Sequence, residues 1–242
     1  MANLVKKKST ISTKNYESDL MSFFTDTNVP IGYTIIHDKW HEDSKKFYKE
    51  NKKEDIFWST LVKKEYGNTL KNITKLTESF LNKSNYFLRN NTKDFVNYKE
   101  FENYILKQTK SCCLDDTKKI RILEEFWNKY DFIEGISEQI YDKFKSFSDD
   151  FEKIYFKRDN KLNNIMILHN CGLNNYSKYP TIISNLNRNG IHDPDYKIII
   201  DAHDCGLLHD ELTFVSNDGE MLESISKINT SYLKIIEFKS CT

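Results

Sequence analysis

Four acidic residues could carry chemistry together: Asp26, Glu65, Asp195 and Asp218. Each follows a short apolar run typical of a buried strand, or lies near the start of a predicted helix. In an open parallel sheet, ligands bind outside the carboxyl ends of the strands, so acids placed there can converge. Clustered carboxylates repel one another unless a cation neutralises them. We therefore expect an acidic, metal-binding centre at this edge.

The chemistry of such a centre follows from its ligands. Carboxylate oxygens favour Mg²⁺ or Mn²⁺ over softer metals. Two such ions, about 4 Å apart, could activate a water molecule and stabilise the leaving oxygen of a phosphodiester. The alternative for any single acid is a helix cap or an exposed surface charge. The placement of all four near the ends of different elements favours the shared centre.

The elements that must position these acids are short strands separated by helices. Five apolar runs predict the strands: 20–24, 56–58, 165–168, 212–215 and 233–238. Helical patterns or breaks predict helices at 40–52, from 60 onward after a Ser59 or Thr60 cap, and at 179–187, 194–205 and 220–228. The helix at 194–205 is expected to stop at a glycine C-cap, Gly206. This alternation predicts an α/β fold with three layers, α/β/α, around a mainly parallel sheet.

The middle of the chain, residues 69–160, has a different pattern. Apolar residues recur there at steps of three and four, which is typical of amphipathic helices, and no strand signal interrupts them. The clearest stripe is Ile133, Ile136, Ile140, Phe144, Phe147, Phe151 and Ile154. We interpret 69–160 as a large helical insertion. The α/β domain is then discontinuous, 19–68 with 161–242, and residues 1–18 form a polar, basic arm.

Asp195 is preferred to three neighbouring acids because of its position. At 100° per residue it lies on the apolar face of the helix at 194–205, which should turn to the sheet. Asp201 and Asp204 point away from that face. Asp193 precedes a proline, which favours the first helical position, so it is expected to be the N-cap.

Four segments resemble the motifs of PIN-domain ribonucleases, and they occur in that family's order: 24–33, 58–65, 195–206 and 214–218. The first contains an Asp-Thr-Asn triplet, and the second contains a strand, a turn and an acidic helix. The third has an acid, a small residue seven positions on and a glycine eleven positions on. The fourth ends in Ser-Asn-Asp, like the motif that closes the family's site. None of the four lies in the helical middle.

The resemblance implies a metal-dependent nuclease that cuts RNA, with the four acids as ligands of Mg²⁺ or Mn²⁺. By the same resemblance, the hydroxyls of Thr27 and Ser216 would hold the carboxylates in place, and the Asn28 side chain would support the loop. Candidate substrate contacts are a histidine at the end of a predicted strand and two lysines beside Glu65: His169, Lys63 and Lys64. The helical block and local lysines would cradle the RNA. Alternatives for this block are a lid, a homodimer surface or a docking site for a protein regulator such as an antitoxin.

Composition narrows the class of protein. The 242 residues carry 36 basic and 36 acidic side chains, so the net charge is zero and tight nonspecific binding to nucleic acid is disfavoured. No segment approaches the roughly 20 apolar residues of a membrane span. Five cysteines, an odd number without any Cys-x-x-Cys pair, predict free thiols in a reducing, cytoplasmic compartment. The same lack of paired spacing argues against a zinc site.

Two other functions remain open. One is a catalytically silent PIN-like module whose insertion recruits partners and whose acids bind a structural ion. The other is a relative that cuts DNA, including single-stranded DNA, as a toxin or a phage-defence effector. His37 and His41 have the i, i+4 spacing of a helical metal pair but lack the HExxH pattern. We therefore expect them to be surface or partly buried residues.

Overall fold

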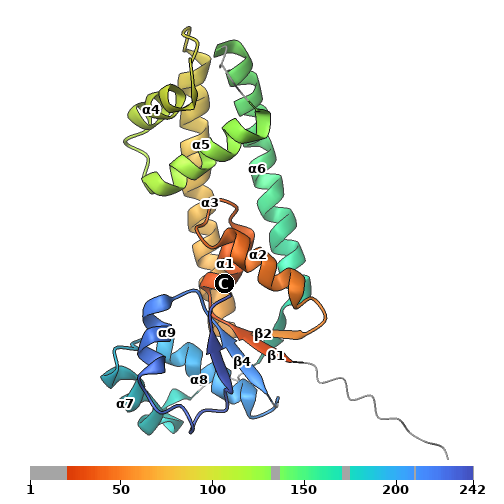
Figure 1. Ribbon diagram of the computed structural model, residues 1–242, viewed down its shortest axis with the longest axis vertical. Coiled ribbons are helices and arrows are strands. Elements are labelled where there is room, and N and C mark those ends of the chain that lie inside the picture. Colours follow the sequence, from red (N-terminus) through yellow and green to blue (C-terminus); the bar gives the residue numbers. More distant parts are fainter. Residues whose placement is uncertain (1–20, 132–136, 171–174, 210, 242) are drawn as a thin grey trace, which may run out of the picture.

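The computed structural model describes residues 21–131, 137–170, 175–209 and 211–241. The expected basic arm, 1–18, lies outside these residues. An α/β body lies at one end of the molecule, and long helices project away from it (Figure 1). Among the described residues, no helix combines the length and hydropathy needed to cross a bilayer.

The α/β body is organised around a five-stranded sheet in the order β3-β2-β1-β4-β5, in which every pairing is parallel. Its strands are β1 (Ser22–Thr25), β2 (Asp55–Ser59), β3 (Ile167–His169), β4 (Leu212–Val215) and β5 (Glu237–Lys239). The central strand β1 is buried along its whole length. The parallel sheet predicted from the alternating pattern is therefore confirmed, with all five described strands parallel rather than most of them.

For one strand, the predicted burial was wrong. The run at 165–168 was expected to be a buried strand, yet β3 begins at Ile167 and its residues are exposed or half-buried. Ile165 instead ends the preceding helix. The reason is position, because β3 lies at the edge of the sheet and pairs with β2 alone. Short apolar runs cannot tell an edge strand from a central one.

Alternate strand residues pack into two different helical layers. On one face, Phe23 contacts Phe47 of α2 (His41–Glu50), with ring centroids 5.4 Å apart. On the other, Phe57 contacts His209, which follows α8 (Asp195–Gly206), at 4.4 Å. This two-residue alternation gives the three-layer α/β/α arrangement.

The remaining helices of the body are α1 (Asn28–Thr34), α7 (Pro180–Arg188) and α9 (Gly219–Ser226), with a 3-10 turn at Tyr176–Lys178. The sequence patterns did not predict α1, which contains a proline and a glycine. Gly32 is needed there because a Cβ would lie 2.5 Å from the Ser44 hydroxyl oxygen and 3.1 Å from the Trp40 carbonyl oxygen. This close approach holds α1 against α2.

The projecting part consists of four helices: α3 (Thr60–Arg89), α4 (Tyr98–Gln108), α5 (Asp116–Tyr130) and α6 (Ser137–Ile165). Of the two hydroxyls considered as the cap of α3, Ser59 is the one that caps it, since its hydroxyl accepts from the Val62 amide at 3.2 Å. The predicted stripe is buried at Ile140, Phe144, Phe147 and Phe151. Ile133 and Ile136 lie outside the described residues. Both long helices, α3 and α6, begin or end inside the α/β body, so 69 and 160 fall within helices rather than between elements.

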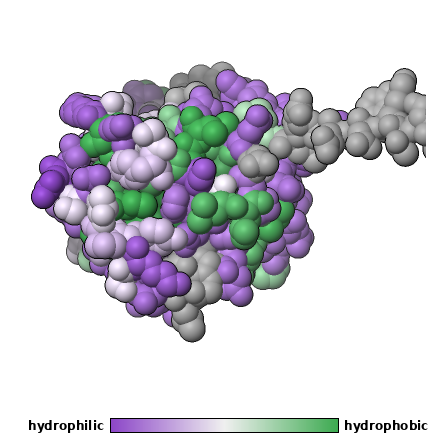
Figure 2. All heavy atoms as spheres, turned by 90° about the horizontal axis from the view of Figure 1, so that it is seen from below, coloured by the Kyte–Doolittle hydropathy of each residue, from purple (hydrophilic) through white to green (hydrophobic). Residues whose placement is uncertain are grey.

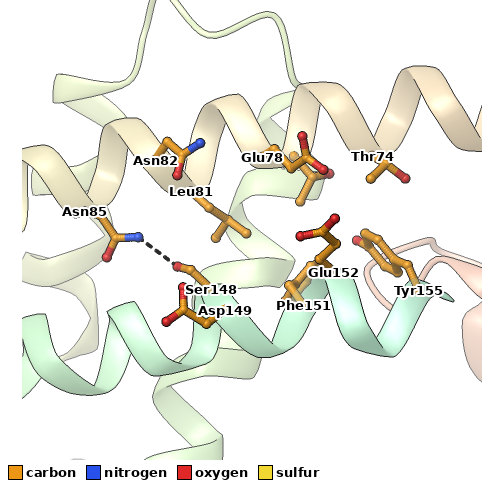
Figure 3. A pocket seen from close by; sticks show the side chains of 11 residues that line it. Thr74, Glu78, Leu81, Asn82, Asn85, Ser148, Asp149, Phe151, Glu152 and Tyr155 are labelled. Carbon is orange, nitrogen blue, oxygen red and sulfur yellow. Dashed lines mark hydrogen bonds between the residues drawn. The ribbon is translucent and has the colours of Figure 1, made fainter. Parts of the chain in front are cut away.

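A polar cleft of about 300 Å³ lies between α3 and α6. Figure 3 shows side chains of both helices directed into this space, with a hydrogen bond from Asn85 to Ser148. At its floor, Tyr155 pairs with the buried His37 ring at 2.9 Å. Burial lowers the pKa of His37 to about 3, so this ring stays neutral and structural. His41 is also buried, with its Nδ1 atom 2.8 Å from the Gly32 carbonyl oxygen, so the expectation of surface or partly buried histidines was wrong.

Candidate metal centre

Each of the four acids is placed at the carboxyl edge of the sheet by a different element. Asp26 directly follows β1, and Glu65 lies in the second turn of α3, which begins as soon as β2 ends. Asp195 is the first residue of α8, and Asp218 lies between β4 and α9. Parallel strands end at one edge, so residues far apart in sequence meet there.

Asp26 is the most constrained of the four. Its side chain is buried, and its Oδ2 atom accepts from the Ser216 hydroxyl at 2.8 Å and from the Asn28 amide at 2.7 Å. Its Oδ1 atom accepts from the Thr27 backbone amide at 2.6 Å. Three donors from two strand ends thus fix the orientation of this carboxylate.

The same neighbours connect the ends of different elements. The Thr27 hydroxyl donates to Glu65 Oε2 at 2.9 Å, which ties the end of β1 to α3. The Asn28 side-chain oxygen accepts from the Asn217 backbone amide at 2.8 Å, which ties β1 to the loop after β4. The residues expected to brace the acids, Thr27, Asn28 and Ser216, all make such contacts.

The pKa values of two of the carboxyls, Asp26 and Asp195, are raised in part by their acidic neighbours. Burial raises the pKa of Asp26 to about 6, and the charges of Asp195 and Glu65 add to this rise, against the Ser216 and Thr27 hydrogen bonds. Burial also raises the pKa of Asp195, reinforced by Asp218 and Glu65. Each acid is therefore within electrostatic reach of at least one other. Such mutual repulsion is what a bound cation would relieve.

The carboxylates nevertheless form an open cluster. In the described part of the chain, the one group of three or more His, Cys, Asp or Glu side chains with ligand atoms within 4.8 Å of one another is His169, Cys205 and His209. The four acids are spaced more widely than a single closed ion site. An open cluster of oxygen ligands is compatible with the chemistry of Mg²⁺ or Mn²⁺, since Mg²⁺ keeps several waters and uses only one or two carboxylates.

Asp218 has a second role. It is the N-cap of α9, where its Oδ1 atom accepts from the Met221 amide at 3.0 Å. The helix-cap alternative is therefore correct for this residue, and its other oxygen can face the cluster. Its own backbone amide donates to the Ser216 hydroxyl at 3.0 Å, so the cap and the bracing hydroxyl belong to one tight turn.

The structure corrects two expectations about α8. Asp193 is not the N-cap; Pro194 occupies that position without a capping side chain, and Asp193 pairs with Lys197 on the surface. The helix also has more than one buried side. Asp201, expected to point away from the sheet-facing side, is buried and accepts from the Tyr176 hydroxyl at 3.1 Å. The 3-10 turn before α7 covers that side, which helical periodicity alone cannot show.

A third correction concerns Gly206. Gly206 is the last residue of α8, but its φ angle is not positive. It is therefore not the left-handed glycine cap that was expected. Its small size is required instead, because a Cβ there would lie 1.7 Å from the Lys234 carbonyl oxygen. The end of α8 therefore packs directly against the backbone that leads to β5.

The candidate substrate contacts lie in two different places. Lys63 and Lys64 are exposed on α3 beside Glu65, and Lys63 also lies over the Trp58 ring at 5.5 Å. His169 ends β3 and groups with Cys205 and His209 rather than with the four acids. The sequence reasoning missed this group. The i, i+4 spacing of Cys205 and His209 was the available signal, but the third member comes from a distant strand.

Comparison of the chain with protein-family models, with curated proteins and with solved structures found no match.

Proposed function

We propose that the chain is a metal-dependent nuclease of the PIN type, acting on RNA. The observation that carries the proposal is Asp26, a buried carboxylate held by three hydrogen-bond donors, with its pKa raised to about 6 by burial and by two neighbouring carboxylates. An aspartate so placed is unfavourable in isolation. It is typical of a site that is completed by a cation or a proton.

The roles of the residues follow from their chemistry. Asp26 and Glu65 would hold the ions from the β1 and α3 side, while Asp195 and Asp218 would hold them from the α8 and α9 side. When bound, Mg²⁺ or Mn²⁺ supplies the positive charge that offsets the carboxylates and polarises a phosphate. Ser216 and Asn28 keep the Asp26 Oδ2 atom in place, which limits reorganisation during the reaction.

A nucleic-acid substrate is supported by two basic regions. Lys63 and Lys64 directly precede Glu65 on α3, and both are exposed. A second region is a groove of about 690 Å³ between α2 and α6, with six basic residues in its lining: Lys45, Lys49, Lys52, Lys157, Arg158 and Lys161. Concentrated positive charge of this kind attracts a phosphate backbone even when the net charge is zero. The projecting helices then remain available as a lid, a homodimer surface or the docking site of a regulator such as an antitoxin.

Labelled RNA and single-stranded DNA, incubated with Mn²⁺, test this function. The wild-type chain should cut RNA, and Asp26→Asn should reduce the rate by on the order of 100-fold or more, as expected for loss of a metal ligand. Asp55→Asn is the matched control, because Asp55 is an exposed aspartate at the opposite, amino-terminal end of the neighbouring strand. It should cut like wild type.

The other outcomes separate the alternatives. Equal cleavage by wild type and Asp26→Asn would refute the site. Cleavage of DNA alone would favour the DNA-cutting relative. Binding of Mn²⁺ and RNA without any cleavage would favour the silent module. A cytoplasmic location is part of the proposal, since Cys112, Cys113, Cys205 and Cys241 are free thiols among the described residues.

A further inference from the structure

A second group of metal-ligating side chains lies away from the four acids. One ligand atom each from His169, Cys205 and His209 come within 4.8 Å of one another. The two histidine rings lie 6.5 Å apart between centroids and are both half-buried, while Cys205 is fully buried. Three side chains from two elements thus point at one small volume that solvent can reach from the histidine side.

His169 lies on β3, and Cys205 and His209 lie at and just after the end of α8. His169 is the last residue of β3 and pairs in register with Ser59 of β2. Cys205 lies in the last turn of α8, and the His209 amide donates to the Cys205 carbonyl oxygen at 3.1 Å. The Phe57 ring of β2 packs against both histidines, at 6.4 and 4.4 Å between ring centroids.

The end of α8 is also fixed from its other side. The Lys234 backbone amide donates to His203 Nδ1 at 2.9 Å. Next to Cys205, the backbone at Gly206 approaches the Lys234 carbonyl so closely that no larger residue would fit. The Cys205 sulfur is therefore held in position by packing, and this pre-organisation favours ligand binding.

The ligand types select the metal. One thiolate and two imidazoles suit Zn²⁺, which binds sulfur and nitrogen in tetrahedral sites, and they do not suit Mg²⁺ or Mn²⁺. Burial raises the pKa of the Cys205 thiol to about 12, so it is protonated at neutral pH unless a metal replaces the proton. Three protein ligands leave the fourth tetrahedral position for water or another small ligand.

This group is separate from the acidic centre. Asp195 begins α8 and Cys205 lies ten positions later, so about 15 Å of helix separates them. We propose that His169, Cys205 and His209 form a zinc-binding site that fastens the edge strand β3 to the end of α8. This proposal departs from the expectation, drawn from cysteine spacing, that argued against a zinc site.

The strand β3 and its neighbours contain features that a metal crosslink would stabilise. β3 has three residues and one neighbouring strand, and Ile167 and Leu168 are large exposed hydrophobic residues beside His169. Leu207 and Leu208, between the other two ligands, are also exposed. Figure 2 shows hydrophobic groups among the polar ones on the face seen from below. A metal crosslink between strand and helix would stabilise this weakly held edge.

Metal content of the purified full-length chain tests the proposal. The chain is saturated with Zn²⁺, freed of excess metal by gel filtration and analysed by mass spectrometry. We expect one zinc per chain, and a loss of affinity of about tenfold or more in Cys205→Ser and in His209→Gln. Co²⁺ in place of zinc should give the near-ultraviolet charge-transfer band of a cobalt–thiolate bond, and Cys205→Ser should abolish it.

Three controls make the result specific. Cys113→Ser and His192→Gln remove an exposed thiol and an exposed imidazole elsewhere, and both should retain zinc. The double variant Asp26→Asn, Asp195→Asn should also retain it, which excludes binding at the acidic centre. Thermal unfolding should shift upward with zinc in wild type and in these controls, but not in His209→Gln.

The proposal is overturned if wild type retains no zinc, or if Cys205→Ser and His209→Gln retain it as wild type does. It is also overturned if the double aspartate variant loses the zinc. Should Cys205→Ser fail to fold, the cobalt spectrum of wild type decides, because the absence of a thiolate charge-transfer band excludes Cys205 as a ligand. None of these outcomes depends on nuclease activity.

Discussion

The raised pKa of Asp26 has a direct consequence for stability. A carboxyl group whose pKa is higher in the folded state holds its proton more tightly there than in the unfolded chain. Protonated Asp26 therefore stabilises the fold below its ordinary pKa of 3.8, and this stabilisation is lost as the pH rises through about 6. Asp26→Asn, which cannot ionise, should lack that pH dependence.

The size of the effect follows from the pKa difference. Each unit corresponds to about 1.36 kcal/mol, so a rise from 3.8 to about 6 gives a limit of about 3 kcal/mol. Between about pH 4 and pH 8, about 2 kcal/mol of this should be lost from the wild-type free energy of unfolding. Asparagine at position 26 accepts the Ser216 and Asn28 hydrogen bonds less well than aspartate. The resulting loss of stability is similar at both pH values, so it largely cancels when the two free energies of unfolding are subtracted.

Urea denaturation of wild type and Asp26→Asn, in chelator at both pH values, measures this difference. We measure the free energy of unfolding of Asp26→Asn minus that of wild type at each pH. This difference should be about 2 kcal/mol larger at about pH 8 than at about pH 4. Asp55→Asn, at an exposed position, should follow wild type. Parallel pH profiles for wild type and Asp26→Asn would refute the inference that burial and neighbouring carboxylates act on Asp26. Added Mg²⁺ or Mn²⁺ should then raise the stability of wild type more than that of Asp26→Asn.

Three further substitutions, each at a single position, have opposite or specific expected effects. Gly206→Ala places a Cβ 1.7 Å from a backbone carbonyl oxygen and should lower the free energy of unfolding by about 3 kcal/mol or more. Gly67 lies in open space on α3, so Gly67→Ala should raise the free energy of unfolding by about 0.5–1 kcal/mol. If urea denaturation shows both alanine variants shifted in the same direction, this account is wrong. Ser216→Ala removes a donor that lowers the pKa of Asp26, so the lower pH midpoint of Mn²⁺-dependent cleavage should move up by about half a unit or more. An unchanged midpoint would show that this hydroxyl does not act on Asp26.

Much of the α/β body could be predicted from local pattern. The apolar runs at 56–58 and 212–215 correspond closely to β2 and β4, and the hydroxyl at Ser59 caps α3 as expected. These signals are local, since strand burial, helix periodicity and capping each depend on a few neighbouring residues. Helix α1 was missed because proline and glycine weaken its local signal, while its packing on α2 stabilises it.

The candidate acidic site was also open to prediction, because a parallel sheet brings its carboxyl ends together whatever lies between them. Helical geometry favoured Asp195 over its neighbours, and Asp195 lies within electrostatic reach of Asp218 and Glu65. The same face argument was wrong for Asp201, which is buried, so the choice of Asp195 stays a prediction. The reason given for Gly206 was wrong, since the requirement comes from a carbonyl 28 residues away in sequence rather than from the helix end itself.

By itself, the sequence determined the α/β class, the parallel sheet and where most of the helices and strands form, because each of these depends on short-range patterns. It also predicted four acids at the carboxyl edge of the sheet. Only the tertiary structure decided that β3 is an exposed edge strand, that Asp26 is buried among three donors, and that His169 meets Cys205 and His209. Each of these features includes at least one contact between residues more than 30 positions apart. Their formation requires the whole fold, so no local pattern encodes them.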